Sequence, residues 1–102
     1  MSILFQVAPA ELEDLLISHE NIVDSCVIGV PCERAGELPR AYIVKKPDCH
    51  LTEDEVKDFV GKRFSDHKQL RGGVQFVEQL PKSPSGKLLR RVLKDQYLTE
   101  RK

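Results

Sequence analysis

The segment from Pro81 to Lys87, PKSPSGK, has the residue types of a loop that delivers one positive charge. Gly86 allows backbone angles that other residues rarely adopt, and Pro81 and Pro84 restrict the chain before it. Lys87, expected at the start of the last helix, carries a compact cation on four methylene groups, which suits transient stabilisation of an anion. The pattern makes Lys87 the first candidate for a catalytic residue, and the alternative is an ordinary surface lysine.

Two other kinds of site fit this loop less well. A Walker loop requires G-x-x-x-x-G-K-[ST], whereas Pro81 occupies the first glycine position and Leu88 replaces the hydroxyl residue. A nucleic-acid site is disfavoured because 16 basic residues balance 16 acidic ones, so no overall field attracts a polyanion. The nearby basic residues are interpreted as the solvated side of a packed helix; they are Lys87, Arg90, Arg91 and Lys94.

The composition is that of a single globular domain. The chain has 102 residues, of which 40% are apolar and 31% charged, and it can bury one core. No apolar run is long enough to span a bilayer, and the segment Met1 to Val7 lacks the pattern of a signal peptide. We therefore expect a protein inside the cell, in the cytoplasm or an organelle.

Cysteine and histidine spacing argues against a metal centre or a disulfide framework. The cysteines are odd in number, contain no C-x-x-C pair and fit a reducing environment best. The histidines lack metal-ligand spacing and are interpreted as surface or helix-end residues. These residues are Cys26, Cys32, Cys49, His19, His50 and His67. No metal site is expected in this chain.

Three segments have the apolar spacing of amphipathic helices. The first is expected from about Pro9 to His19, where acidic residues that include Glu13 complement the positive end of the helix dipole. The second must begin after Thr52, which can form a capping box with Glu55. The third follows the PKSPSG loop. The apolar stripes are Leu12, Leu15 and Leu16; Val56, Phe59, Val60 and Phe64; and Leu89, Val92, Leu93 and Tyr97.

Three segments are expected to form strands. The apolar run from Cys26 to Val30, ending at Pro31, is typical of a strand that is covered on both faces. A second strand is expected at residues 38–45, after a polar loop, and a third at residues 74–77, after the break at Gly72-Gly73. The order of elements predicts an α+β fold: a small mixed sheet of about three strands with about three packed helices.

Four ordered motifs carry a family resemblance. They are FQVAPAELE at residues 5–13, GELPRAY at 36–42, LRGGV at 70–74 and PKSPSGK at 81–87. Together they resemble the C-terminal domain of the adenylate-forming, or AMP-binding, superfamily. This superfamily includes acyl-CoA synthetases, 4-coumarate-CoA ligases, beetle luciferases and the adenylation domains of peptide synthetases. The resemblance runs from about Phe5 to Tyr97 and is strongest to the luciferase and 4-coumarate ligase branch.

The resemblance implies a small domain that closes over a larger N-terminal adenylation domain, which binds ATP, magnesium and a carboxylic acid. It implies that Lys87 enters the active site while the acyl-adenylate forms and withdraws when the thioester with CoA is made. Phe5, Gln6 and Gly86 are the residues expected to contact nucleotide or CoA. Weaker candidates, for contacts with the larger domain or CoA phosphates or only for roles in turns, are Glu37, Lys68 and Arg71.

One position departs from the family pattern, because Leu4 stands where family members have glycine. The 102 residues are expected to hold only the C-terminal domain, without a nucleotide-binding domain, so the isolated chain should be inactive and bind neither ATP nor CoA. The alternative is a stand-alone, non-catalytic binding module that derives from such a domain and binds a synthetase in trans or another partner. Neither nucleic acid nor a membrane is expected as a partner.

Overall fold

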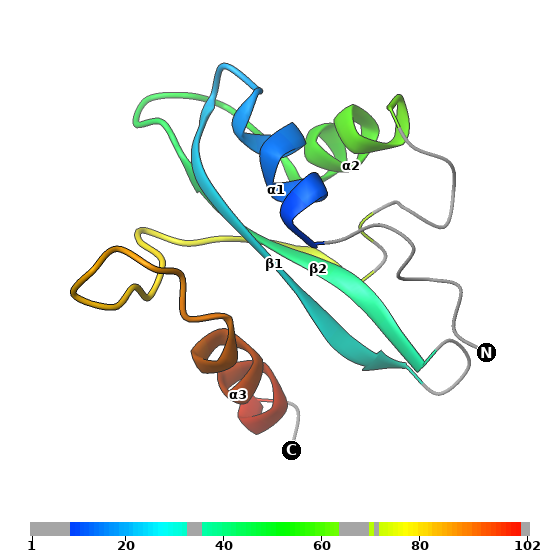
Figure 1. The fold of residues 1–102 in the computed structure, drawn as a ribbon. Helices are drawn as coiled ribbons and strands as arrows, with labels where there is room; N and C mark the ends of the chain where they lie inside the picture. Colours follow the sequence, from blue (N-terminus) through cyan, green and yellow to red (C-terminus); the bar gives the residue numbers. More distant parts are fainter. Residues whose placement is uncertain (1–8, 33–35, 64–69, 71, 101–102) are drawn as a thin grey trace.

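The computed structural model describes residues 9–32, 36–63, 70 and 72–100 of the chain. This part contains three helices and one three-stranded sheet (Figure 1). The predicted α+β fold is therefore confirmed. In chain order, the elements are α1 (Pro9–Ile17), β1 (Ile22–Cys32), β2 (Gly36–Lys45), α2 (Glu53–Gly61), β3 (Val74–Phe76) and α3 (Arg90–Glu100).

The sheet is mixed and has the strand order β1-β2-β3. β1 and β2 form a long antiparallel ribbon, and β2 pairs with the short β3 in parallel. β1 is longer than the predicted strand: Pro31 does not end it but pairs with Glu37, which lies in β2 rather than in a polar loop. A proline is tolerated there because β1 lies at the edge of the described sheet.

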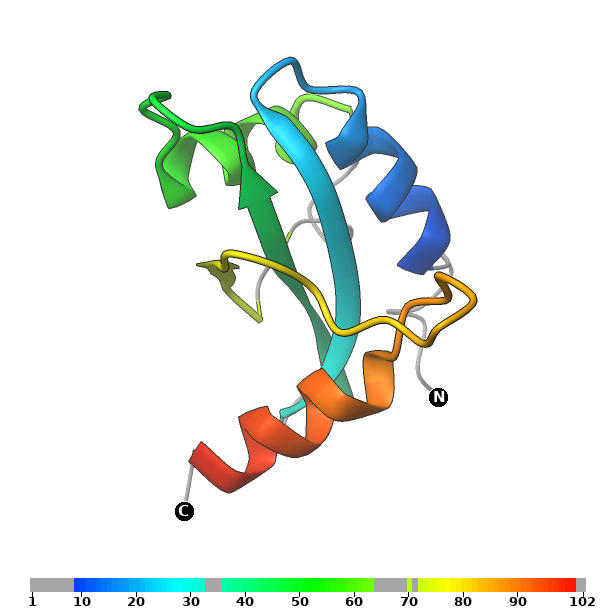
Figure 2. The same cartoon turned by 90° about the vertical axis from the view of Figure 1, so that its left-hand side faces the viewer.

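Both faces of the sheet are covered, as the sequence predicts for β1. In Figure 1, α1 and α2 lie on one side of the β1-β2 ribbon and α3 lies on the other. Side chains along β1 alternate between two apolar clusters: Val27 belongs to the cluster under α1 and α2, while Cys26 and Ile28 belong to the cluster under α3. Figure 2 shows the segment between β3 and α3 crossing this second face, where Leu80 is buried.

The start of α2 forms as its sequence predicts. The Thr52 hydroxyl accepts a hydrogen bond from the Glu55 amide at 3.2 Å, and the Glu55 carboxylate accepts one from the Thr52 amide at 3.0 Å. Leu51 and Val56 on either side are both buried. The capping box is confirmed, and it satisfies two amides that the helix itself leaves without partners.

Replacing Thr52 by alanine is expected to lower the free energy of unfolding by about 1 kcal/mol, because the helix loses its side-chain cap. Urea denaturation of the chain measures this change. Thr52→Ser keeps the capping oxygen and serves as the matched control, which should remain close to wild type. Equal stability of the alanine and serine variants would contradict a capping role.

Candidate functional site

The PKSPSGK segment is a closed hairpin. The Ser83 amide donates to the Lys87 carbonyl at 2.8 Å, and the Gly86 amide donates to the Ser83 carbonyl at 2.8 Å. Gly86 has a φ of +88°, the left-handed backbone that typically ends a three-residue hairpin loop. Proline, serine and glycine at residues 84–86 thus suit a sharp reversal of the chain, and the unusual backbone angle predicted for Gly86 is confirmed.

Lys87 lies on the second arm of this hairpin and not at a helix start. The neighbouring Leu88 forms an isolated antiparallel bridge with Lys82, so the backbone there is extended. α3 begins only at Arg90. The expectation that Lys87 opens the helix is therefore wrong, because pairing between the hairpin arms takes precedence over helix formation.

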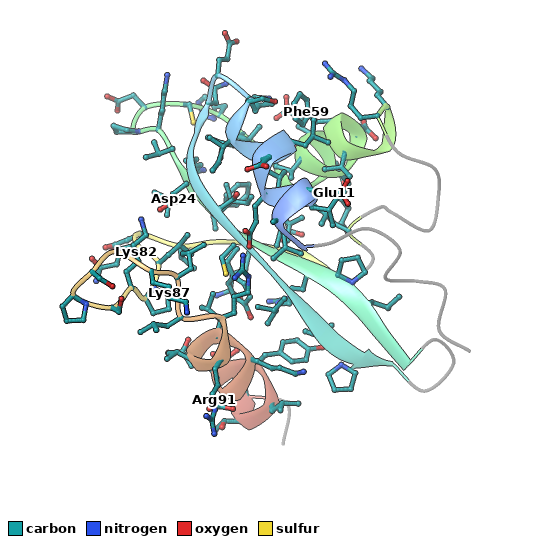
Figure 3. All side chains as sticks on the ribbon, in the orientation of Figure 1. Glu11, Asp24, Phe59, Lys82, Lys87 and Arg91 are labelled. Carbon is teal, nitrogen blue, oxygen red and sulfur yellow. The ribbon has the colours of Figure 1, made fainter. Side chains whose placement is uncertain are left out.

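Lys87 is exposed, and Figure 3 shows its side chain at the hairpin near the start of α3. Within the described ranges, no carboxylate lies within ion-pair distance of it. Its backbone is held instead: the Lys87 amide donates to the Ser83 hydroxyl oxygen at 3.2 Å, and this oxygen lies 2.9 Å from the Ser85 hydroxyl. A fixed backbone therefore carries a cation that is available to an external anion.

Two ion pairs join the base of the hairpin to the rest of the domain. On the first arm, Lys82 Nζ lies 2.7 Å from Asp24 Oδ2, and Figure 3 shows the two side chains together. After the second arm, Arg90 Nε donates to Glu13 Oε2 at 3.1 Å and Arg90 Nη2 donates to Glu13 Oε1. The loop is thus connected to β1 on one side and to α1 on the other.

Sequence reasoning misses the pair between Glu13 and Arg90. Glu13 is expected to act on the helix dipole and Arg90 to face solvent, yet Glu13 is buried and also accepts a hydrogen bond from the Val27 amide at 2.8 Å.

Burial of Cys26, and secondly the adjacent Glu13 carboxylate, raise the pKa of the Cys26 thiol to about 11. The thiol therefore stays protonated at neutral pH.

The GELPRAY motif has a structural role that was also missed. Arg40 donates to the Gly72 carbonyl at 3.1 Å, to Gln75 Oε1 at 2.7 Å and to the Tyr42 hydroxyl at 3.1 Å. Its guanidinium carbon lies 5.0 Å from the centre of the Tyr97 ring. A single arginine thus connects β2, the segment before β3, and α3.

The two glycines before β3 permit this close packing. A Cβ atom on Gly72 would lie 2.7 Å from the Pro39 carbonyl oxygen, which accepts a hydrogen bond from the Gly72 amide. Gly73 has a φ of +107°, and a Cβ atom there would lie 2.7 Å from Arg40 Nη1. The predicted break at Gly72-Gly73 is therefore a site of close approach between two motifs.

The other residues predicted to act in the site are only partly visible. Phe5, Gln6, Lys68 and Arg71 lie outside the described residues, as does His67, and the side chain of Glu37 is not described. His19 follows α1, and its ring centre lies 4.8 Å from that of Phe59; His50 is exposed. Among the residues in the described ranges, no group of three metal-binding side chains occurs. None of the described helices has the length and apolar content that crossing a membrane requires.

Sequence comparison assigns the hairpin and the domain around it to a protein family. The model of the AMP-binding enzyme C-terminal domain matches residues 11–87. The chain belongs to this family. It is the C-terminal domain of adenylate-forming, acyl-CoA synthetase-like ligases, which confirms the resemblance inferred from the four motifs. The match contains Lys87 as its last residue.

Individual relatives agree with the family assignment. The chain is 53% identical over 90 residues to 4-coumarate:CoA ligase 1 of Petunia hybrida, covering 88% of this chain and 16% of the ligase. The crystal structure of Brucella canis acyl-CoA synthetase superposes with a TM-score of 0.86 at 29% identity over 94% of this chain and 18% of that one. ATP-bound MatB from Rhodopseudomonas palustris superposes with a TM-score of 0.84 at 30% identity, over 89% of this chain and 18% of that one. The chain therefore spans less than a fifth of the length of these relatives.

Gly86→Ala is expected to open the hairpin more often, because the left-handed backbone costs other residues about 1–2 kcal/mol. No heavy atom lies within 4 Å of the added Cβ, so the effect is conformational and not a clash. The Ser83 amide should exchange its hydrogen roughly 5 to 30 times faster, as measured by native-state hydrogen exchange. Gly86→Asn should have a smaller effect, and unchanged exchange in the alanine variant would contradict this account.

Proposed function

We propose that Lys87 supplies the positive charge for adenylate formation when this domain acts with an N-terminal adenylation domain, in cis or in trans. The observation that carries the proposal is the exposed ammonium of Lys87, without an ion-pair partner in the described ranges, on a hairpin with a hydrogen-bonded backbone. The reaction would be the ATP-dependent activation of a carboxylic acid, followed by thioester formation with CoA. Membership of the acyl-CoA synthetase-like family supports this reaction.

The chemistry of adenylate formation suits an ammonium group. When a carboxylate displaces pyrophosphate from ATP, negative charge develops on the attacking and phosphoryl oxygens. A preorganised cation in a water-poor site stabilises such charge by several kcal/mol. Lys87 would approach these oxygens as a compact donor, and the rigid backbone of the hairpin would limit the reorganisation needed during the reaction.

The described residues fit a phosphate group better than a metal ion. Lys87 presents an accessible cation, whereas no group of three metal-binding side chains occurs in the described ranges. We therefore assign the binding of ATP and Mg²⁺ to the N-terminal domain, and only a contact with ATP phosphate or reacting oxygens to this chain. We expect the 102-residue chain alone to make no adenylate.

The second half-reaction would use another face of the domain. We propose that rotation of the domain withdraws Lys87 and brings the segment with Phe5 and Gln6 to CoA. The cation is needed in only one of the two steps, so it is best carried by a domain that moves between them. Leu4 is a larger residue than the glycine of the family pattern next to this segment. We place the reaction in a reducing compartment of the cell, because the cysteines of the sequence are odd in number and contain no C-x-x-C pair.

A chimera tests the role of Lys87. The chain replaces the C-terminal domain of the petunia ligase, and adenylate formation is measured as pyrophosphate release with 4-coumarate and ATP. Lys87→Ala is expected to slow this step roughly 100- to 1,000-fold, the usual effect of removing one preorganised donor from a reacting oxyanion.

Lys46→Ala is the matched control for this experiment, because Lys46 is also an exposed lysine but directly follows β2, outside the hairpin, and has no ion pair in the described ranges. It should leave the rate unchanged. A chimera in which Lys87→Ala is as fast as wild type would refute the proposed role. A folded chimera that makes no adenylate at all would favour a non-catalytic binding module.

A further inference from the structure

We propose that Glu13 and Arg90 form a positioning pair that sets the place of Lys87 relative to the domain. This inference rests on the proposed function of Lys87, since neither residue would touch the substrate. Glu13 lies on α1 and Arg90 is the first residue of α3. The pair therefore connects two helices through residues that are 77 positions apart in the chain.

The geometry of the pair leaves its two members little freedom. Only 8% of the Glu13 side chain is exposed, and its oxygens accept from the Arg90 fork and from the Val27 amide. Two parallel hydrogen bonds from a guanidinium fix orientation as well as distance. A carboxylate in this position is costly without its partner, so α1, β1 and the start of α3 are held together.

Arg90 is coupled to the hairpin by short backbone connections. Only Leu88 and Leu89 separate it from Lys87, and the Leu89 amide donates to the Pro81 carbonyl at 3.0 Å. The next residues, Leu88 and Lys82, form the bridge between the two arms. A shift of Arg90 would therefore move both arms and carry Lys87 with them.

The second ion pair at the hairpin is the weaker constraint. The Lys82 and Arg90 side chains are both 42% exposed, but Asp24 is 25% exposed whereas Glu13 is only 8% exposed. The carboxylate of the Lys82–Asp24 pair therefore keeps more contact with water, and ion pairs in contact with water contribute little to stability. Lys82 also has a single ammonium where Arg90 has a planar fork. We therefore assign the principal positioning role to Glu13 and Arg90.

The rest of α3 does not depend on this pair for its packing. Leu93 is buried and Tyr97 packs against the same apolar cluster on the sheet. These contacts hold the middle of the helix, whereas Arg90 holds the end that joins the hairpin. Loss of the pair should therefore displace Lys87 more than it unfolds the domain.

The test compares both half-reactions in the petunia chimera. Arg90→Ala should slow adenylate formation roughly 10- to 100-fold, because a displacement of about 1 Å at a reacting group can cost up to about 100-fold. Thioester formation from preformed 4-coumaroyl-adenylate should change less than about twofold, because Lys87 is withdrawn in that step. Arg91→Ala, the neighbouring exposed arginine, should leave both rates unchanged.

A double-mutant cycle separates positioning from general damage to the fold. If Arg90 acts through Lys87, Arg90→Ala should cause no further loss of adenylate formation in a Lys87→Ala background. An equal loss in both backgrounds, or an equal loss in both half-reactions, would overturn the inference. Normal adenylation by Lys87→Ala would instead refute the proposed function, and normal adenylation by Arg90→Ala alone would refute only the positioning role.

Arg90→Lys covers the case in which the alanine variant does not fold. It keeps the positive charge beside the buried Glu13 carboxylate but loses the planar fork. In the isolated chain, the Leu89 amide of this variant should exchange its hydrogen faster than in wild type, because the base of the hairpin is held less tightly. In the chimera, adenylate formation should be slower by roughly 10-fold. A folded Arg90→Lys variant with wild-type exchange and wild-type adenylation would overturn the inference.

Discussion

A carboxylate that is removed from water must meet hydrogen-bond donors, and the buried side chain of Glu13 meets them from two distant segments. The Val27 amide on β1 and the Arg90 guanidinium at the start of α3 both converge on it. This requirement brings α1, the edge strand and the end of the hairpin to one place. The start of α3, which follows the hairpin, is thus held to α1 and β1 through this buried charge.

Covering the sheet on both faces gives the hairpin a rigid support. β1 contributes side chains to two apolar clusters, one under α1 and α2 and the other under α3. Packing on both sides limits how far the sheet can move. The hairpin itself lies outside these layers (Figure 1), so Lys87 can be exposed while Glu13, which accepts hydrogen bonds from Arg90 at the end of the hairpin, is buried. Functional residues are often carried in this way, on a loop that a rigid scaffold positions.

The other motifs of the family also act through packing in this structure. Arg40 in GELPRAY and Gly72-Gly73 in LRGGV belong to one contact, in which the arginine donates to the Gly72 carbonyl and a side chain on Gly72 would meet the Pro39 carbonyl. These motif residues therefore have a structural role in this fold. The chemistry of adenylate formation is proposed for Lys87. Phe5 and Gln6, proposed for the step with CoA, lie outside the described residues.

Local patterns in the sequence determined the elements of this protein, and the contacts between them were decided only in three dimensions. The capping box at Thr52, the turn at Gly86 and the apolar stripe of α1 depend on residues a few positions apart, so they are readable from the chain. Local patterns do not predict where the strands end, that α3 starts only at Arg90, or that Glu13 pairs with Arg90. These features depend on partners up to 77 residues away, and the sequence of one segment does not say which distant group will neutralise its charge or bond its backbone.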